Sequence, residues 1–258
     1  MATSTALPAS VSSTDAVGEA DSRRARVILI LVALVIGSLI SAAFGLWHPE
    51  PDGANDGFAY DTVADMRGAW WAWHIFGSIG TAVSVFAASL AVLLLAPRRG
   101  AAWATAGAII TSLGALAFVA GASAEGVVLS YATDADALDV ETGRSFVDFV
   151  NENPDQVAAI IIPGFLLMTL GAFLLAAALW RAGTVPRWLP VALGVGNVAM
   201  FVAPWGTASR IVGVVFTAII LAIGWYLWRN RHQVGVQPIA QGNLSVAPSP
   251  EFEPVARP

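Results

Sequence analysis

The apolar segments of this sequence contain few polar residues, and four of these could take part in chemistry. His74, Glu125, Asn197 and Arg210 lie within or directly beside apolar runs. An ionisable or amide side chain is costly to place in a bilayer, so residues of this kind often mark binding sites or pathways. We therefore predict that these four side chains line a ligand pocket.

Each of the four residues also has an ordinary structural explanation. His74 could be hydrogen-bonded within a helix bundle, and Glu125 could reach water at the end of its helix. Arg210 could extend to the lipid headgroups, and Asn197 could bond a neighbouring backbone carbonyl. The sequence alone leaves both explanations open for every residue.

Histidine and carboxylate side chains could also bind a metal ion. The candidate ligands are His48, His74 and Glu125, which together could hold zinc in a membrane-embedded hydrolase. They lack a characteristic ligand spacing, and the chain has no cysteine, which excludes disulfides, thiolate metal sites and cysteine nucleophiles. The sequence has no phosphate-binding glycine loop, serine elbow or basic aromatic patch. We accordingly assign no catalytic residue and expect no cofactor and no nucleic-acid partner.

Six apolar segments must position these residues. They cover residues 27–47, 70–96, 102–125, 157–180, 188–205 and 210–228. Each has 18 or more residues, and about 20 helical residues cross the hydrocarbon core of a bilayer. We therefore predict an all-α integral membrane protein, built as a bundle of six transmembrane helices.

The composition agrees with this fold class. Of the 258 residues, 57% are hydrophobic and only 12% are charged, whereas a soluble domain carries about 25% charged residues. We expect a transmembrane domain over residues 27–228. The flanking segments, 1–26 and 229–258, are rich in small polar residues or proline and are expected to be disordered tails.

Two long connections are expected on one side of the membrane, over residues 48–69 and 126–156. In the second connection, apolar residues alternate with acids between Asp136 and Asn151 and stop before Pro154. This pattern predicts a short amphipathic helix on the surface or over the end of the bundle.

The arginines predict the orientation. All 13 basic residues are arginine, and with six passes only Arg67, Arg144 and Arg210 fall on the side of the two long connections. Cytoplasmic loops carry an excess of arginine, so we expect both termini to be cytoplasmic. The ten tryptophans lie near segment ends, where the membrane interface favours them. The use of arginine with abundant Ala, Val and Gly is typical of a GC-rich genome and suggests a bacterial plasma membrane.

Small residues recur at helical spacing inside the segments, and such stripes allow helices to pack closely in lipid. The stripes consist of Gly37, Ser41 and Gly45 in the first segment, Gly80, Ser84 and Ala88 in the second, and Gly107, Thr111, Gly114 and Gly121 in the third. Pro163 predicts a bend in the fourth segment.

The distribution of ionisable groups suggests a class of function. With the predicted orientation, His74, Glu125 and Arg210 all lie toward the outer face. We expect a non-enzymatic protein with an outward-facing polar pocket for a small molecule. One alternative is a small-molecule transporter that acts as a homo-oligomer, suggested by Asn197 and its flanking glycines. The metal-dependent hydrolase is the second alternative, and the lipid bilayer is the partner common to all three.

Overall fold

The computed structural model describes residues 13–232, and within this range its regular structure is entirely helical. Five helices are long and apolar enough to cross a membrane, namely α1, α3, α4, α6 and α8. This confirms the predicted all-α membrane fold. The elements are α1 (Ser13–Trp47), the 3-10 turn η1 (Ala54–Asp56), α2 (Tyr60–Asp65), α3 (Arg67–Leu95), α4 (Ala101–Ala132), α5 (Val140–Glu152), α6 (Asp155–Ala182), α7 (Trp188–Val202) and α8 (Thr207–Arg229).

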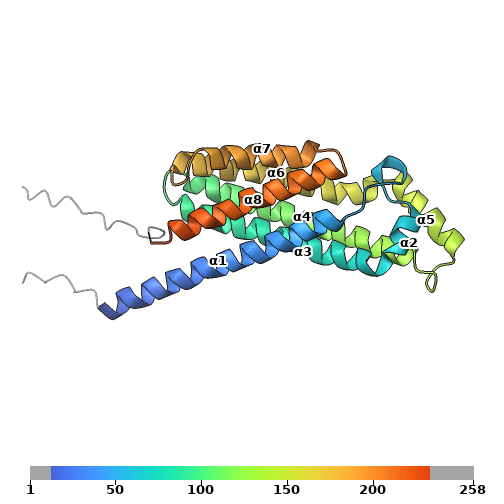
Figure 1. Ribbon diagram of the computed structural model, residues 1–258, viewed down its shortest axis with the longest axis horizontal. Helices are drawn as coiled ribbons and strands as arrows, with labels where there is room; N and C mark the ends of the chain where they lie inside the picture. The colour runs from blue at the N-terminus through green and yellow to red at the C-terminus, as the bar shows by residue number, and fades with distance from the viewer. Residues whose placement is uncertain (1–12, 233–258) are drawn as a thin grey trace, which may run out of the picture.

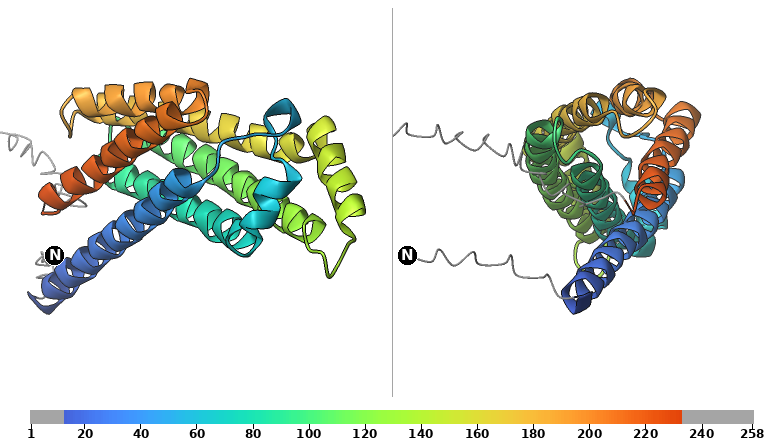
Figure 2. Two further views of the ribbon diagram at one scale, coloured as in Figure 1. Left: turned by 45° about the vertical axis from the view of Figure 1, so that its right-hand side comes forward. Right: turned by 90° about the vertical axis from the view of Figure 1, so that its left-hand side faces the viewer.

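The five long helices and α7 form a ring (Figure 2). Around the ring, α1 packs against α3, α3 against α4, α4 against α6, α6 against α7, α7 against α8, and α8 against α1. In addition, α3 contacts both α6 and α8. The beginning of α1 and the end of α8 lie at the same end of the bundle, and α2 and α5 lie at the other (Figure 1). We call the end with α2 and α5 the cap end.

Glycines bring α4 and α6 into direct backbone contact. A Cβ atom on Gly114 would lie 2.6 Å from the carbonyl oxygen of Gly164. A Cβ atom on Gly171 would collide with the side chain of Thr111, whose hydroxyl donates to the Gly107 carbonyl at 2.6 Å. Close packing of this kind holds helices together in lipid, where the hydrophobic effect between them is absent. The small-residue stripe of the third apolar segment therefore forms the α4–α6 interface.

One ring helix is shorter than the sequence pattern predicts. The apolar run covers residues 188–205, but α7 ends at Val202 because the backbone of Ala203 is extended. Pro204 explains this, since a proline disfavours the helical conformation at the residue before it. With 15 residues, α7 is about 22 Å long, which is less than the roughly 30 Å of a hydrocarbon core.

The largest extensions beyond the predicted segments are in α1 and α4. α1 begins at Ser13, within the expected disordered tail, and its first turns contain Ala, Glu and Arg, which favour helix. α4 continues past Glu125 to Ala132, because Leu129 and Ala132 are buried in a cluster of apolar side chains at the cap end. The rest of the expected tails, residues 1–12 and 233–258, lies outside the described residues.

α5 forms where the sequence predicts an amphipathic helix, and it covers the cap end. Asp139 caps it by accepting a hydrogen bond from the Thr142 backbone N–H at 3.0 Å. The helix stops at Glu152, one residue before the Asn153–Pro154 pair. The buried Asn151 amide donates to the Phe58 carbonyl at 3.0 Å and so fixes α5 to the connection between α1 and α2.

An exposed ion pair joins α5 to α2. Arg144 donates two hydrogen bonds to Asp61, at 2.7 Å and 3.0 Å. The Arg144 guanidinium holds the pKa of the Asp61 carboxyl below its usual value. A carboxyl with a lowered pKa stabilises the folded state above its unfolded pKa of about 3.9, and that stability is lost as the pH falls through the folded pKa.

We therefore expect the attachment of α5 to weaken below about pH 3.9. Hydrogen-exchange protection factors in α5 should fall over this range in the wild-type protein. In Asp61→Asn, which lacks the carboxylate at every pH, they should be lower at neutral pH and respond less to acid. An identical acid response in both proteins would show that other groups control the cap.

Candidate functional site

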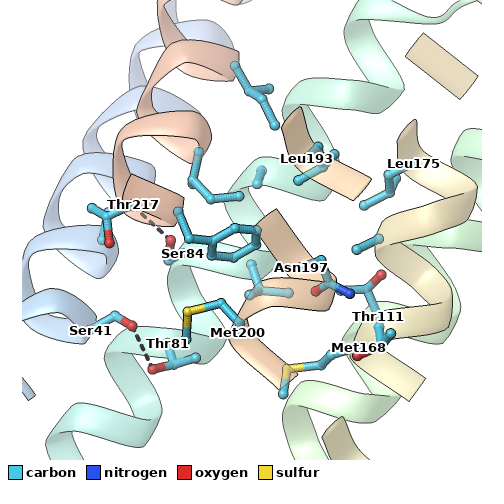
Figure 3. A pocket seen from close by; sticks show the side chains of 18 of the residues that line it. Ser41, Thr81, Ser84, Thr111, Met168, Leu175, Leu193, Asn197, Met200 and Thr217 are labelled. Carbon is cyan, nitrogen blue, oxygen red and sulfur yellow. Dashed lines mark hydrogen bonds between the residues drawn. The ribbon is translucent and has the colours of Figure 1, made fainter. Parts of the chain in front are cut away.

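A cavity of about 140 Å³ lies inside the ring of helices, and all six ring helices contribute to its lining (Figure 3). Its walls are mainly apolar side chains from α3, α6, α7 and α8. Among the described residues, no acid, base, histidine or tyrosine lines the cavity. Its polar groups are the Asn197 amide and the hydroxyls of Ser38, Ser41, Thr81, Ser84, Thr111, Thr169 and Thr217.

Several of these hydroxyls already have protein partners. The hydroxyls of Ser38 and Ser84 are hydrogen-bonded at 2.7 Å, and those of Ser41 and Thr81 at 2.9 Å. Both pairs join α1 to α3, and Figure 3 shows the second of them. Thr111 bonds its own helix through the Gly107 carbonyl. These hydrogen bonds stabilise the wall, and in the Ser38–Ser84 pair the accepting hydroxyl keeps its own hydrogen.

Asn197 differs from the hydroxyls because its side-chain nitrogen, Nδ2, is buried without a hydrogen-bond partner. α7 directs this residue inward, since Leu189, Leu193 and Asn197 follow one another at intervals of four on its buried face. Figure 3 shows the amide among side chains that include Thr111 and Met168. An unsatisfied buried donor costs about 1–3 kcal/mol. Asn197 thus gives the cavity a fully buried donor that can bond an acceptor atom of a ligand.

Two histidines meet at the cap end. His74 on α3 is 2% exposed, and its Nδ1 lies 2.8 Å from the Trp70 carbonyl oxygen. His48 follows directly after α1, and its Nδ1 lies 3.0 Å from the Pro49 carbonyl oxygen. The ring centres are 5.2 Å apart. We call His48 and His74 the histidine pair.

Glycine is required on α4 for His74 to occupy its position. A Cβ atom on Gly126 would collide with the Cβ atom of His74. The α7–α8 connection also contacts the histidine pair. Its Trp205 ring stacks on the His48 ring, with the ring centres 5.9 Å apart. Gly206 permits this turn with a φ of 98°, in a region that side chains rarely tolerate.

Arg210 of α8 approaches the histidine pair through backbone and carboxylate contacts. Its Nη2 donates to the His48 carbonyl at 3.2 Å, and its Nη1 lies 3.9 Å from Oε1 of Glu50. Burial lowers the pKa of His48, the hydrogen bond to the Pro49 carbonyl opposes this, and the Arg210 guanidinium lowers it further. Burial and Arg210 thus both favour the neutral form of the His48 ring.

The four residues predicted to line one pocket occupy three places. His74 and Arg210 both contact His48 at the cap end, and Asn197 lines the central cavity. Glu125 lies on α4 one turn after Gly121 and is half-buried, and its carboxylate has no hydrogen bond or ion pair with another described residue. The predicted zinc ligands do not form a three-residue site, because residues 13–232 contain no group of three or more His, Asp or Glu side chains able to hold a metal.

Comparisons with known proteins find no relative of this chain. No protein-family model, no curated protein and no solved structure matches the chain.

Proposed function

We propose that this chain is a non-enzymatic, multi-pass membrane protein that binds a small, mainly apolar molecule in its central cavity. The observation that carries the proposal is the unpaired Nδ2 of Asn197 in a cavity lined by all six ring helices. Buried polar groups nearly always have a partner, so an exception of this kind favours a binding role. The lining supplies no acid or base within the described residues, which favours binding over catalysis.

The size and lining of the cavity define the chemistry of the ligand. Its volume of about 140 Å³ resembles that of an engineered cavity of about 150 Å³ that holds benzene in another protein. A charged ligand would find no charged partner there, and its desolvation would be costly. We therefore expect an uncharged molecule of about benzene size that carries one acceptor, such as a carbonyl, ether or hydroxyl oxygen.

Three lining residues support an entrance from the lipid. Phe165, Met200 and Phe201 line the cavity and are also 39%, 41% and 55% exposed, respectively. Met200 and Phe201 lie in the last turn of α7, the short helix of the ring. An apolar ligand dissolved in the bilayer could enter beside this helix end without crossing water.

We further propose that the cap end faces the outside of a bacterial plasma membrane. At the opposite end, Arg98 and Arg99 lie between α3 and α4, Arg181 lies in the last turn of α6, Arg187 directly precedes α7, and Arg229 ends α8. An excess of arginine is typical of the cytoplasmic side. This orientation places both termini in the cytoplasm.

A transporter is the second candidate function. The cavity residues Thr81 and Met168 lie near the middle of their helices, and secondary transporters bind substrate near the bilayer midplane. Pro163 interrupts the backbone bonding of α6 and supplies a possible site of bending. Transport by so few helices would be expected to involve a homo-oligomer. Uptake by proteoliposomes, measured with and without Asn197→Leu, tests this alternative.

The binding proposal is tested with two probes of equal size, cyclohexanone and methylenecyclohexane, of which only the ketone accepts a hydrogen bond. We expect the detergent-purified protein to prefer the ketone by about tenfold in affinity, as one hydrogen bond of about 1.4 kcal/mol predicts. Ligand-observed NMR measures both affinities. Asn197→Leu should remove the preference, because it replaces the amide with a side chain of similar size.

The control is Val198→Leu, which changes the neighbouring residue on the exposed face of α7. It should preserve the preference for the ketone. Equal affinity for both probes in the wild-type protein, or an undiminished preference in Asn197→Leu, would disprove the proposed role of Asn197.

A further inference from the structure

We propose that the histidine pair, His48 and His74, is a binding site for one Cu(I) ion at the cap end of the bundle. This site is separate from the central cavity, whose lining contains neither histidine. The proposal therefore does not depend on the ligand that the cavity binds.

Both histidines use Nδ1 in a hydrogen bond, which leaves Nε2 of each ring free to bind a metal. A carbonyl oxygen only accepts, so each Nδ1 must carry the proton that it donates to Trp70 or Pro49. Each neutral ring then has a lone pair on Nε2. Metal-binding histidines commonly donate their other N–H to a backbone carbonyl in this way, which fixes the tautomer and orients the ring.

The Nε2 atom of His74 is a buried acceptor without a partner. The Nε2 atom of His48 likewise has no hydrogen bond to any of the described residues. The buried acceptor on His74 is costly to leave unpaired, and a neutral His48 cannot satisfy it, because its own Nε2 is also an acceptor. A bound cation would provide the partner that both nitrogens lack.

The separation of the rings suits two bonds to one ion. With a metal–nitrogen bond of about 2.0 Å, two imidazole centres bound through Nε2 would lie about 5 to 6.3 Å apart as the angle at the metal opens. The observed separation of the ring centres, 5.2 Å, falls within this range. A small rotation of His48, the less buried ring of the two, would open the angle.

The surroundings favour a monovalent ion over a divalent one. The Glu50 carboxylate lies near Arg210, and Glu125 does not join the histidine pair. Without a carboxylate ligand, the charge of the ion stays uncompensated, and its desolvation cost rises with the square of that charge. Zinc sites have at least three protein ligands, whereas calcium and magnesium require oxygen ligands.

Cu(I) fits the remaining chemistry. It is a d¹⁰ ion that forms two-coordinate complexes, and imidazole is a suitable ligand for copper. The aromatic ring of Trp70 lies 4.5 Å from the His74 ring, and that of Phe58 lies 5.3 Å from the His48 ring. The faces of such rings attract a cation and exclude water. The pair thus offers two neutral nitrogens within an aromatic enclosure.

The test uses the full-length protein in detergent, under anaerobic conditions, with Cu(I) buffered by the chromophoric chelator bicinchoninate. We expect the protein to withdraw one Cu(I) per chain from the chelator. His48→Phe and His74→Phe should each lower the affinity at least 100-fold, because phenylalanine preserves the aromatic packing and removes the nitrogen ligand. His232→Phe is the matched control, since His232 is exposed and lies beyond the end of α8, away from the cap.

Thermal unfolding of each variant distinguishes the loss of a ligand from the loss of the fold. Should His74→Phe fail to fold, His48→Phe decides the question, because His48 is only half-buried. X-ray absorption of the loaded protein should show nitrogen neighbours at about 2.0 Å. Failure of the wild-type protein to compete with bicinchoninate, or Cu(I) binding that persists unchanged in His48→Phe, would overturn the proposal.

Discussion

Gly114→Leu is expected to prevent recovery of the folded bundle. The Cβ atom of any side chain at this position would lie 2.6 Å from the Gly164 carbonyl oxygen and 2.6 Å from the Met168 backbone nitrogen. Both neighbours are backbone atoms of α6, so they cannot move aside as a side chain would. The two helices would have to separate along the most extensive interface of the ring.

The expected loss in the free energy of unfolding can be compared with the total stability of a typical protein. Overpacking a core typically costs about 1–3 kcal/mol and sometimes more, out of a total of about 5–15 kcal/mol. We expect Gly114→Ala to destabilise by about 1–3 kcal/mol and Gly114→Leu by more than that. Tryptophan fluorescence during unfolding in mixed detergent micelles measures both variants.

Gly213 provides the control, because it lies within α8 and a Cβ atom there would meet nothing within 4 Å. Gly213→Leu should therefore unfold at nearly the same detergent composition as the wild-type protein. If Gly114→Leu were as stable as Gly213→Leu, the close approach of α4 and α6 would not be what holds these helices together.

Much of the fold could be predicted from the sequence because each helix is encoded locally. Apolar length predicted the long helices, and the acid-alternating pattern before Pro154 predicted α5. The end of α7 was missed because hydropathy counts Ala203 and Trp205 as part of an apolar run and ignores Pro204. A proline rule applied to that run would have found the end at Val202.

The candidate sites were harder to predict because they depend on how the helices are rotated and shifted against one another. His48 and His74 meet because α1 and α3 pack closely, with a Cβ on Gly37 only 2.5 Å from the Ser84 backbone nitrogen. Ser38 was not predicted as a cavity residue, although it lies one turn before Ser41 on the same side of α1. Glu125 follows the small-residue face of α4, but that face packs on α6 rather than on the histidines.

Trp70→Ala is the second substitution from which we expect a large effect. The Trp70 side chain is fully buried, and its ring centre lies 4.5 Å from that of His74 and 4.9 Å from that of Phe58. Removing so large a ring leaves a cavity that the neighbouring residues cannot fill. We expect a loss of about 3–5 kcal/mol in the free energy of unfolding. Trp71→Ala is the adjacent control and should change it by no more than about 0.5 kcal/mol, because Trp71 is 42% exposed.

Trp70→Phe separates the contribution of the ring from that of the indole N–H. The Nε1 atom of Trp70 is buried without a hydrogen-bond partner, so the wild-type protein already bears a cost of about 1–3 kcal/mol for it. Phenylalanine removes this unpaired donor and keeps most of the aromatic contact with Phe58 and His74. We therefore expect Trp70→Phe to cost less than about 1.5 kcal/mol. A loss as large as that of Trp70→Ala would show that the indole N–H makes a bond essential to the cap end.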